Sequence, residues 1–146
     1  EFDAFINAIT TNLTSFFREP HHFEFLKNTI VPQLLSSNKV TKRVRVWSAG
    51  CSTGEEPYSL AITFADLFPS SWDVKILATD LDSNVLAKAQ AGIYTAANVN
   101  GLENNVLKKW FLKSKDGQTY KIKPQLNKHI FFNAILSTAR PCSRAF

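Results

Sequence analysis

Two adjacent glutamates, Glu55 and Glu56, follow a turn of small residues in the stretch VWSAGCSTGEEPYSLAI, residues 46–62. Glycines at positions 50 and 54 let the backbone bend sharply and approach a ligand closely. Nucleotide-binding turns of this kind commonly present glycines and a lysine to phosphate groups. Carboxylates at the same place would repel phosphate, so the pattern indicates a ligand of a different charge.

A third carboxylate, Asp80, ends the next apolar run, VKILAT, residues 74–79. In open α/β sheets the ligand lies beyond the carboxyl ends of the strands, and an acid that ends the second strand binds ribose hydroxyls. We therefore expect Asp80 to lie beside the glycine turn, where the two would form a site for an adenosine.

The motifs that are missing narrow the choice of cofactor. A P-loop needs a lysine after its last glycine, and here Gly54 is followed by Glu55; the spacing of Gly50 and Gly54 also differs from the dinucleotide fingerprint. An adenosine cofactor with a cationic portion and no phosphates fits this turn, and S-adenosylmethionine is such a molecule. The alternative is that the glutamates only cap the helix that begins there.

Metal chemistry is not indicated. The two cysteines are far apart in sequence, which argues against a disulfide framework and favours a reducing cytoplasm. No ligand spacing relates them to the histidines, so we expect no metal; the residues in question are Cys51, Cys142, His21, His22 and His129.

Hydrophobic periodicity predicts the elements that position the carboxylates. We expect a helix from Pro20, and then strand, helix, strand and helix over Arg43–Ala49, Glu55–Phe68, Val74–Thr79 and Ser83–Ala91, with Gly92 ending the last. Ser52 or Thr53 is expected to cap the helix at Glu55, and Asp82 the helix at Ser83. This order predicts a parallel α/β sheet with right-handed crossovers.

The pattern changes after Gly92. Residues 102–111 read as a helix, and the Asp116–Gly117 dipeptide lies between alternating residues, as in an antiparallel hairpin. Its strands are predicted over Trp110–Ser114 and Thr119–Ile122. One more strand is expected over His129–Asn133.

Composition sets the remaining limits. The 146 residues are 45% hydrophobic, enough for one packed domain, and no apolar run approaches the roughly 20 residues that span a membrane. Residues 1–100 hold 8 Lys/Arg and 10 Asp/Glu, whereas residues 101–146 hold 9 and 2. A basic segment can favour an acidic partner or nucleic acid. No aromatic ladder or zinc finger accompanies it, so we expect no nucleic-acid partner.

Four motifs carry a resemblance to a known family. ITTNLTSFFREPHHF, RVWSAGCSTGEEPYSLAI, ILATDLDSNVLAKAQAGIY and KKWF occur in this order between residues 9 and 111. They resemble the CheR family of chemotaxis receptor methyltransferases, which use S-adenosylmethionine to methylate receptor glutamates. The resemblance implies a Rossmann-like methyltransferase fold with a partial parallel sheet and a small antiparallel β-subdomain.

The resemblance also implies a cofactor site, residue by residue. Arg18 matches the family's candidate for working near the transferred methyl and the substrate carboxylate, although an ion pair with Glu19 or Glu24 is the alternative. Asn12 and Thr14 match further positions but could simply cap a helix. The full cofactor set is Asn12, Thr14, Arg18, Ala49, Gly50, Glu55 and Asp80.

Three segments follow from the comparison with the family. Residues 1–35 correspond to the end of the N-terminal helical domain, 36–100 to the cofactor-binding half, and 101–146 to a β-subdomain-like hairpin and tail. In some members this subdomain docks the receptor's C-terminal tail. After Asn133 the sequence departs from the family pattern, and the chain starts at Glu1 without Met, so we expect a fragment or a shortened product.

The resemblance implies that the later strands of the family's sheet are absent, which has consequences for the partners we expect. A half-sheet exposes apolar edges, so we expect self-association through them. The expected partner is the cytoplasmic domain of a chemoreceptor, with no insertion into the membrane. The rival functions are a non-catalytic module that binds S-adenosylmethionine or S-adenosylhomocysteine, a small-molecule methyltransferase, and a basic interaction domain.

Overall fold

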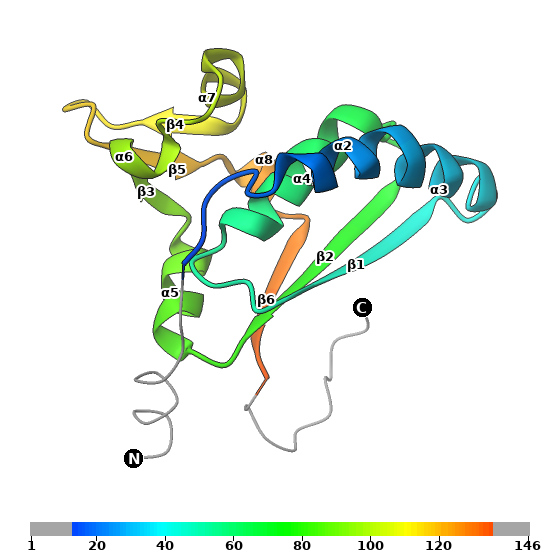
Figure 1. The fold of residues 1–146 in the computed structure, drawn as a ribbon, viewed down its shortest axis with the longest axis horizontal. Helices are drawn as coiled ribbons and strands as arrows, with labels where there is room; N and C mark the ends of the chain where they lie inside the picture. The colour runs from blue at the N-terminus through cyan, green and yellow to red at the C-terminus, as the bar shows by residue number, and fades with distance from the viewer. Residues whose placement is uncertain (1–12, 136–146) are drawn as a thin grey trace.

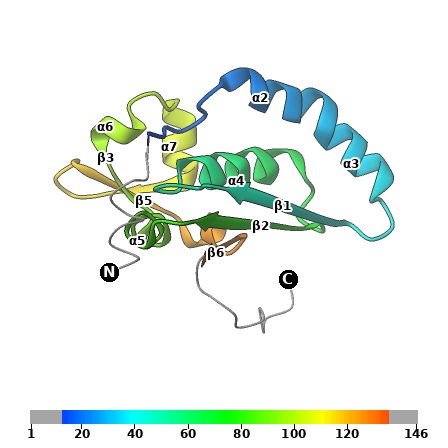
Figure 2. The ribbon, with the colours of Figure 1, turned by 60° about the horizontal axis from the view of Figure 1, so that its bottom comes forward.

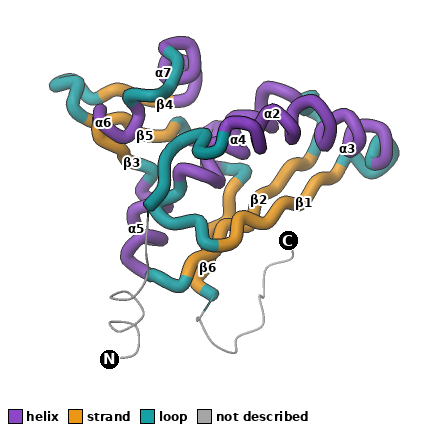
Figure 3. The backbone as a smooth tube through the Cα atoms, viewed as in Figure 1, coloured by secondary structure: helices purple, strands orange, loops and turns teal. Residues whose placement is uncertain are grey.

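The computed structural model describes residues 13–135, which form two small sheets together with helices (Figure 1). Sheet A is parallel with strand order β1-β2-β6, and sheet B is antiparallel with order β3-β5-β4 (Figure 3). The predicted combination of a parallel sheet and an antiparallel subdomain is confirmed. The first part of the expected N-terminal helical segment, residues 1–12, lies outside the described residues.

Sheet A brings together strands that are distant in sequence. Its members are β1 (Arg43–Ala49), β2 (Asp73–Asp80) and β6 (Ile130–Ala134). Ala49 is in register with Thr79, and Asp80 with Ala134. The carboxyl ends of the three strands therefore meet at one edge of the sheet. Asp80 lies at this edge beside the glycine turn, as predicted.

Two helices follow the first two strands. In α4 (Glu55–Leu67) the apolar side packs on sheet A, and in α5 (Ser83–Ala91) the last turn ends at Gly92, whose φ is +59°. The Tyr58 hydroxyl joins the helices by donating to the Ala89 carbonyl at 2.9 Å. Both helices begin where the apolar spacing predicts, at Glu55 and Ser83. Gly92 ends α5, also as predicted.

A continuous helical rod precedes β1. It consists of α2 (Pro20–Phe25), a π-helical turn η1 (Leu26–Ile30) and α3 (Val31–Ser37). The rod lies on the same side of β1 and β2 as α4 (Figure 2). Pro20 starts it as predicted, but the π turn was not predicted. Within residues 13–135 no helix is long and apolar enough to cross a membrane.

Sheet B and its helices are inserted between β2 and β6. Gly117, with φ +74°, makes the turn of the β4–β5 hairpin, which confirms that prediction. The inserted elements are β3 (Ile93–Thr95), α6 (Ala96–Val99), α7 (Asn104–Trp110), β4 (Phe111–Lys113), β5 (Thr119–Ile122) and α8 (Pro124–Asn127).

One face of sheet A carries exposed apolar side chains. Trp47 and Phe131 are 65% and 45% exposed, and both are in register with Leu77 of the central strand. The opposite face buries Val44, Ile76 and Ile130. Parallel strands normally bury both faces, so this row is apolar surface that the described elements leave uncovered.

Candidate cofactor site

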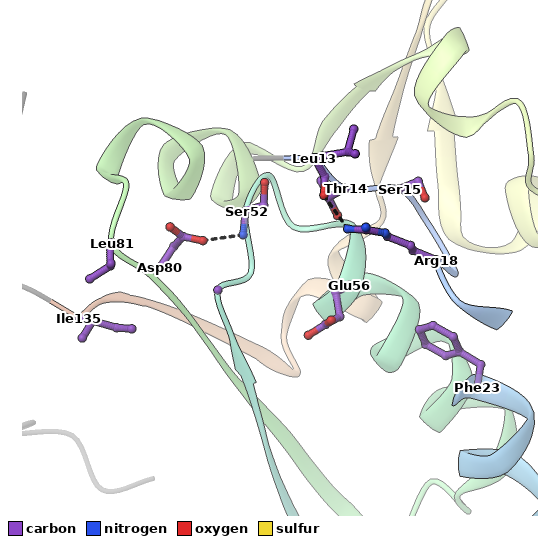
Figure 4. Close-up of a pocket in the computed structure, with 11 residues that line it drawn as sticks. Leu13, Thr14, Ser15, Arg18, Phe23, Ser52, Glu56, Asp80, Leu81 and Ile135 are labelled. Atoms are coloured by element: carbon purple, nitrogen blue, oxygen red, sulfur yellow. Dashed lines mark hydrogen bonds between the residues drawn. The ribbon is translucent and has the colours of Figure 1, made fainter. Parts of the chain in front are cut away.

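A cavity of about 460 Å³ lies beyond the carboxyl ends of β1 and β2 (Figure 4). This volume falls within the range of about 300–1,000 Å³ that is usual for small-molecule sites. The residues that line it come from the segment before α2, α2 itself, the glycine turn, α4 and the ends of β2 and β6. They are Leu13, Thr14, Ser15, Arg18, Phe23, Gly50, Ser52, Glu56, Asp80, Leu81 and Ile135.

The turn between β1 and α4 needs its glycines for different reasons. Gly50 has φ +74° with nothing near the position of a β-carbon, so only its backbone conformation requires glycine. At Gly54, with φ +98°, a β-carbon would lie 2.8 Å from the Tyr94 hydroxyl and 3.2 Å from the Ala89 backbone. Ser52 between them also has a positive φ, +48°, which is a strained conformation for a serine.

Asp80 holds the two loops that border the cavity. One carboxylate oxygen accepts the Ser52 backbone N–H at 2.8 Å, and the other accepts the Asp82 N–H at 3.0 Å. Asp80 is 6% exposed and lines the cavity. Asp82 caps α5 by accepting from the backbone of Asn84 and Val85, as predicted. A carboxylate has about four acceptor positions, so Asp80 keeps acceptor capacity for ribose hydroxyls.

The two glutamates of the turn have separate surroundings. Glu56 lines the cavity and accepts a 2.6 Å hydrogen bond from the Ser48 hydroxyl. Glu55 is 3% exposed and accepts from the Thr53 hydroxyl at 2.6 Å. The prediction that Ser52 or Thr53 caps α4 is wrong, because the N-cap residue is Gly54, which has no side chain.

Arg18 reaches the cavity from a strained loop. Phe17 and Glu19 on either side of it have φ of +50° and +56°, a region that non-glycine residues seldom adopt. Its guanidinium donates to the Leu13 carbonyl at 2.9 Å. Within residues 13–135 Arg18 forms no ion pair with Glu19 or Glu24, the alternative that the sequence left open.

Aromatic contacts attach the same loop to sheet B and to α2. The Phe16 ring meets the edges of Tyr94 and Phe111, with ring centres 4.9 and 5.7 Å apart, and the Phe17 ring meets Phe23 at 5.0 Å. Tyr94 in turn donates from its hydroxyl to the Thr53 carbonyl at 2.8 Å. Burial raises the pKa of the Tyr94 hydroxyl, which keeps it protonated as a donor.

The structure brings together four of the seven predicted site residues. Thr14, Arg18, Gly50 and Asp80 line the cavity. Ala49 lies at the end of β1 without lining it, and Glu55 lies buried beside it. Asn12 is outside the described residues, and the roles of all seven residues in cofactor binding stay predictions.

Sequence reasoning did not single out several of the residues that line the cavity. Ser52 and Leu81 adjoin the predicted turn and strand end, so their positions in the sequence were a usable signal. Ile135 had no such signal: its N–H donates to the Asp80 carbonyl at 3.1 Å only because β6 pairs with β2.

Charge indicates which ligand this cavity suits. Among the described residues that line it, Arg18 is the only cationic side chain, and Glu56 and Asp80 are the acidic ones. An acidic balance disfavours phosphates and suits an adenosine cofactor with a cationic portion. The parallel sheet, the glycine turn and the acid at the end of β2 define a Rossmann-like nucleoside-cofactor domain of the methyltransferase kind.

The chain belongs to the CheR methyltransferase family: residues 12–146 match its SAM binding domain. SAM is S-adenosylmethionine, and the donor set fits it, since Asp80 can meet the ribose and the cavity is acidic. The predictions of family, fold and cofactor are therefore confirmed.

Relatives of known name agree with this assignment. The chain is 45% identical over 108 residues to a probable chemotaxis protein methyltransferase of Rhizobium etli, covering 73% of the chain and 40% of the relative. It is 39% identical over 140 residues to the chemotaxis protein methyltransferase of Salmonella typhimurium, covering 92% and 46%. It is 44% identical over 116 residues to the chemotaxis protein methyltransferase of Escherichia coli, covering 77% of the chain and 37% of the relative. The chain thus spans less than half the length of these relatives.

Proposed function

We propose that this chain is the cofactor-binding part of an S-adenosylmethionine-dependent methyltransferase that modifies glutamate side chains of chemotaxis receptors. One observation carries the proposal: Arg18, Thr14 and Asp80 line a single cavity although Arg18 and Asp80 are far apart in sequence. A cationic side chain in the same cavity as Asp80, the expected ribose-binding acid, supports a carboxylate substrate beside the cofactor.

The residues divide the work by their chemistry. Bound S-adenosylmethionine supplies an electrophilic methyl group for in-line transfer to a carboxylate oxygen. A glutamate side chain is already ionised and nucleophilic at neutral pH, so this chain needs no strong general base. Arg18 would orient the substrate carboxylate, since a guanidinium binds carboxylate oxygens in a fixed geometry. Catalysis would then come from positioning.

Cofactor binding is tested by calorimetric titration of the chain with S-adenosylhomocysteine, with ATP as the matched control. We expect saturable binding of S-adenosylhomocysteine and none of ATP, because ATP brings phosphates to Glu56 and Asp80. Absence of heat and of any thermal shift with S-adenosylhomocysteine would contradict the proposal and leave the basic interaction domain as the better reading.

Methyl transfer is tested with radiolabelled S-adenosylmethionine and a receptor cytoplasmic fragment. We expect label on the fragment and none on a fragment whose acceptor glutamates are changed to glutamine. Label on small carboxylic acids instead would favour a small-molecule methyltransferase. Binding without transfer to either would favour the non-catalytic module.

The receptor's C-terminal tail is proposed to bind sheet B. Among residues 13–135 its outer strands β3 and β4 each pair on one side only, and Lys113, Lys121 and Lys123 supply positive charge for an acidic peptide. Fluorescence anisotropy with a labelled tail peptide tests this. Lys121→Glu should weaken binding if charge contributes, and equal affinity would remove the lysine from the site.

Self-association is proposed through sheet A, where Trp47 and Phe131 stay exposed. Sedimentation velocity over a wide concentration range should show a dimer that Trp47→Lys abolishes. A monomer at every concentration would contradict this proposal.

A further inference from the structure

The loop that carries Arg18 is attached to α4 by a single hydrogen bond. The Phe17 backbone N–H donates to the Ser59 hydroxyl at 2.9 Å, and within residues 13–135 no other hydrogen bond joins residues 13–18 to this helix. Phe17 has φ +50°, a conformation that needs tertiary contacts to persist.

Ser59 is well placed to hold this strained residue. It is fully buried, at 0% exposed, and its hydroxyl donates to the Glu55 carbonyl at 2.7 Å. That bond uses the only hydroxyl proton and turns the oxygen lone pairs toward other donors. The hydroxyl therefore accepts from Phe17 in a fixed direction.

The helix that holds the loop also lines the cavity. Glu56 lies three residues before Ser59 on α4, which puts both near the same side of the helix. Glu56 lines the cavity from this side and Arg18 from the loop. The Phe17–Ser59 bond therefore links the loop that carries Arg18 to the helix that carries Glu56.

We propose that Ser59 is a positioning residue for the cofactor site: its hydroxyl holds the Phe17 amide so that Arg18 faces the cavity. This inference rests on the proposed binding of S-adenosylmethionine. Ser59 itself does not line the cavity, so it acts through the loop. Removing the hydroxyl releases Phe17 and lowers the fraction of molecules in which Arg18 is in place.

Thr63 provides a matched control. Its hydroxyl donates to the Ser59 carbonyl at 2.9 Å, the same bond four residues back that Ser59 makes to Glu55. Thr63 contacts no part of the cofactor cavity. Thr63→Val thus removes one hydrogen bond within the helix and nothing else. Ser59→Ala removes the equivalent bond to the Glu55 carbonyl and also the bond that attaches Phe17.

The experiment titrates the full chain and its variants with S-adenosylhomocysteine. We expect Ser59→Ala to weaken binding about 10-fold, as for a loop that is seated in a tenth of the molecules, and Thr63→Val to leave affinity unchanged. Ser59→Cys should resemble Ser59→Ala, because sulfur is a weak acceptor, and it gives a second variant of similar shape.

A double-mutant cycle with Arg18→Ala shows whether the effect passes through Arg18. In that background Ser59→Ala should cost less than 2-fold, since non-additivity identifies coupled residues. Unchanged affinity in Ser59→Ala and Ser59→Cys, or the full loss in the Arg18→Ala background, would overturn the proposal.

Hydrogen exchange gives a readout without ligand. Exchange at the Phe17 amide and in residues 14–18 should quicken in Ser59→Ala and stay unchanged in Thr63→Val. If the parent chain fails to bind S-adenosylhomocysteine, the proposed function fails, whereas unchanged exchange at Phe17 contradicts the attachment by itself.

Discussion

The Asp80 carboxylate accepts the Ser52 backbone N–H at 2.8 Å and thereby ties the end of β2 to the turn that follows β1. Its other oxygen accepts the Asp82 N–H at 3.0 Å. One side chain therefore shapes both loops at this edge of the sheet. This dual role makes Asp80 a test of structure and binding together.

Asp80→Asn replaces one acceptor oxygen by an amide donor. We expect the free energy of unfolding to fall by about 1–3 kcal/mol, because a buried backbone N–H loses its partner. Affinity for S-adenosylhomocysteine should fall roughly 10-fold, since a charged acceptor at the ribose is lost. Urea denaturation and calorimetry measure the two effects.

Asp73→Asn is the matched control for this change. Asp73 lies at the opposite end of β2 and pairs with Arg45 at 2.6 Å on the surface. Loss of this surface ion pair should lower the free energy of unfolding by about 1 kcal/mol or less. Cofactor affinity should stay unchanged. An equal loss of affinity in both variants would show that Asp80 acts only through stability of the strand.

Gly50→Ala and Gly54→Ala separate conformational strain from crowding. Both need a positive φ, which costs an alanine roughly 1–2 kcal/mol. Only at Gly54 would the new β-carbon also meet other atoms, at 2.8 Å from the Tyr94 hydroxyl and 3.0 Å from the Ala89 side chain. We expect Gly54→Ala to destabilise the fold more, as thermal unfolding would show. Equal destabilisation would mean that the turn relaxes around Gly54.

Glu55→Gln and Glu56→Gln identify which carboxylate meets the cofactor. The resemblance assigns Glu55, whose buried carboxylate already accepts from the Thr53 hydroxyl. We expect Glu55→Gln to weaken S-adenosylhomocysteine binding about 10-fold, as for a hydrogen bond to a charged group. Unchanged affinity in Glu55→Gln together with weaker binding in Glu56→Gln would move the assignment to Glu56, which lines the cavity.

The Cys51 thiol should make the fold sensitive to alkali. Burial, with a further contribution from the nearby Asp80 carboxylate, raises the pKa of Cys51 from 9.0 to about 12. Between these values the folded chain holds more protons than the unfolded chain, so the free energy of unfolding falls as pH rises above 9. Below the unfolded pKa this contribution is fully present.

Cys51→Ala tests that dependence. The variant should lose stability less steeply between pH 9 and 10 in chemical denaturation, because the thiol no longer titrates. Burial also raises the pKa values of Tyr58 and Tyr94, whose contributions begin only near pH 10. Equal slopes in the two proteins would show that the thiol does not control this range.

Local sequence was sufficient for the elements that form around regular patterns. The strand at Arg43–Ala49 and the helix ended by Gly92 follow from side-chain periodicity and from glycine's access to positive φ. The π turn at Leu26–Ile30 does not, since nothing in the apolar spacing before Pro32 distinguishes a π from an α turn. The positive φ of Phe17 is equally hidden, because tertiary contacts impose it on an aromatic residue.

The cofactor site was predictable where it depends on strand ends. Asp80 is such a residue, because the ends of parallel strands share an edge. The choice of Glu55 over Glu56 stays a prediction, since it depends on the rotation with which α4 leaves Gly54. That rotation is set by the positive φ angles of the turn. The positive φ of Ser52 is one of them, and it cannot be predicted from the residue type.

The insertion of sheet B between neighbouring strands β2 and β6 also sets an order of assembly. Closing such a long connection costs chain entropy that must be met before β6 can pair, so the contact of β1 with β2 should form first. On a ribosome, β6 emerges only after sheet B has been synthesised. The side of the cavity that Ile135 lines would then form last. A nascent chain should therefore bind the cofactor only after the inserted sheet has folded.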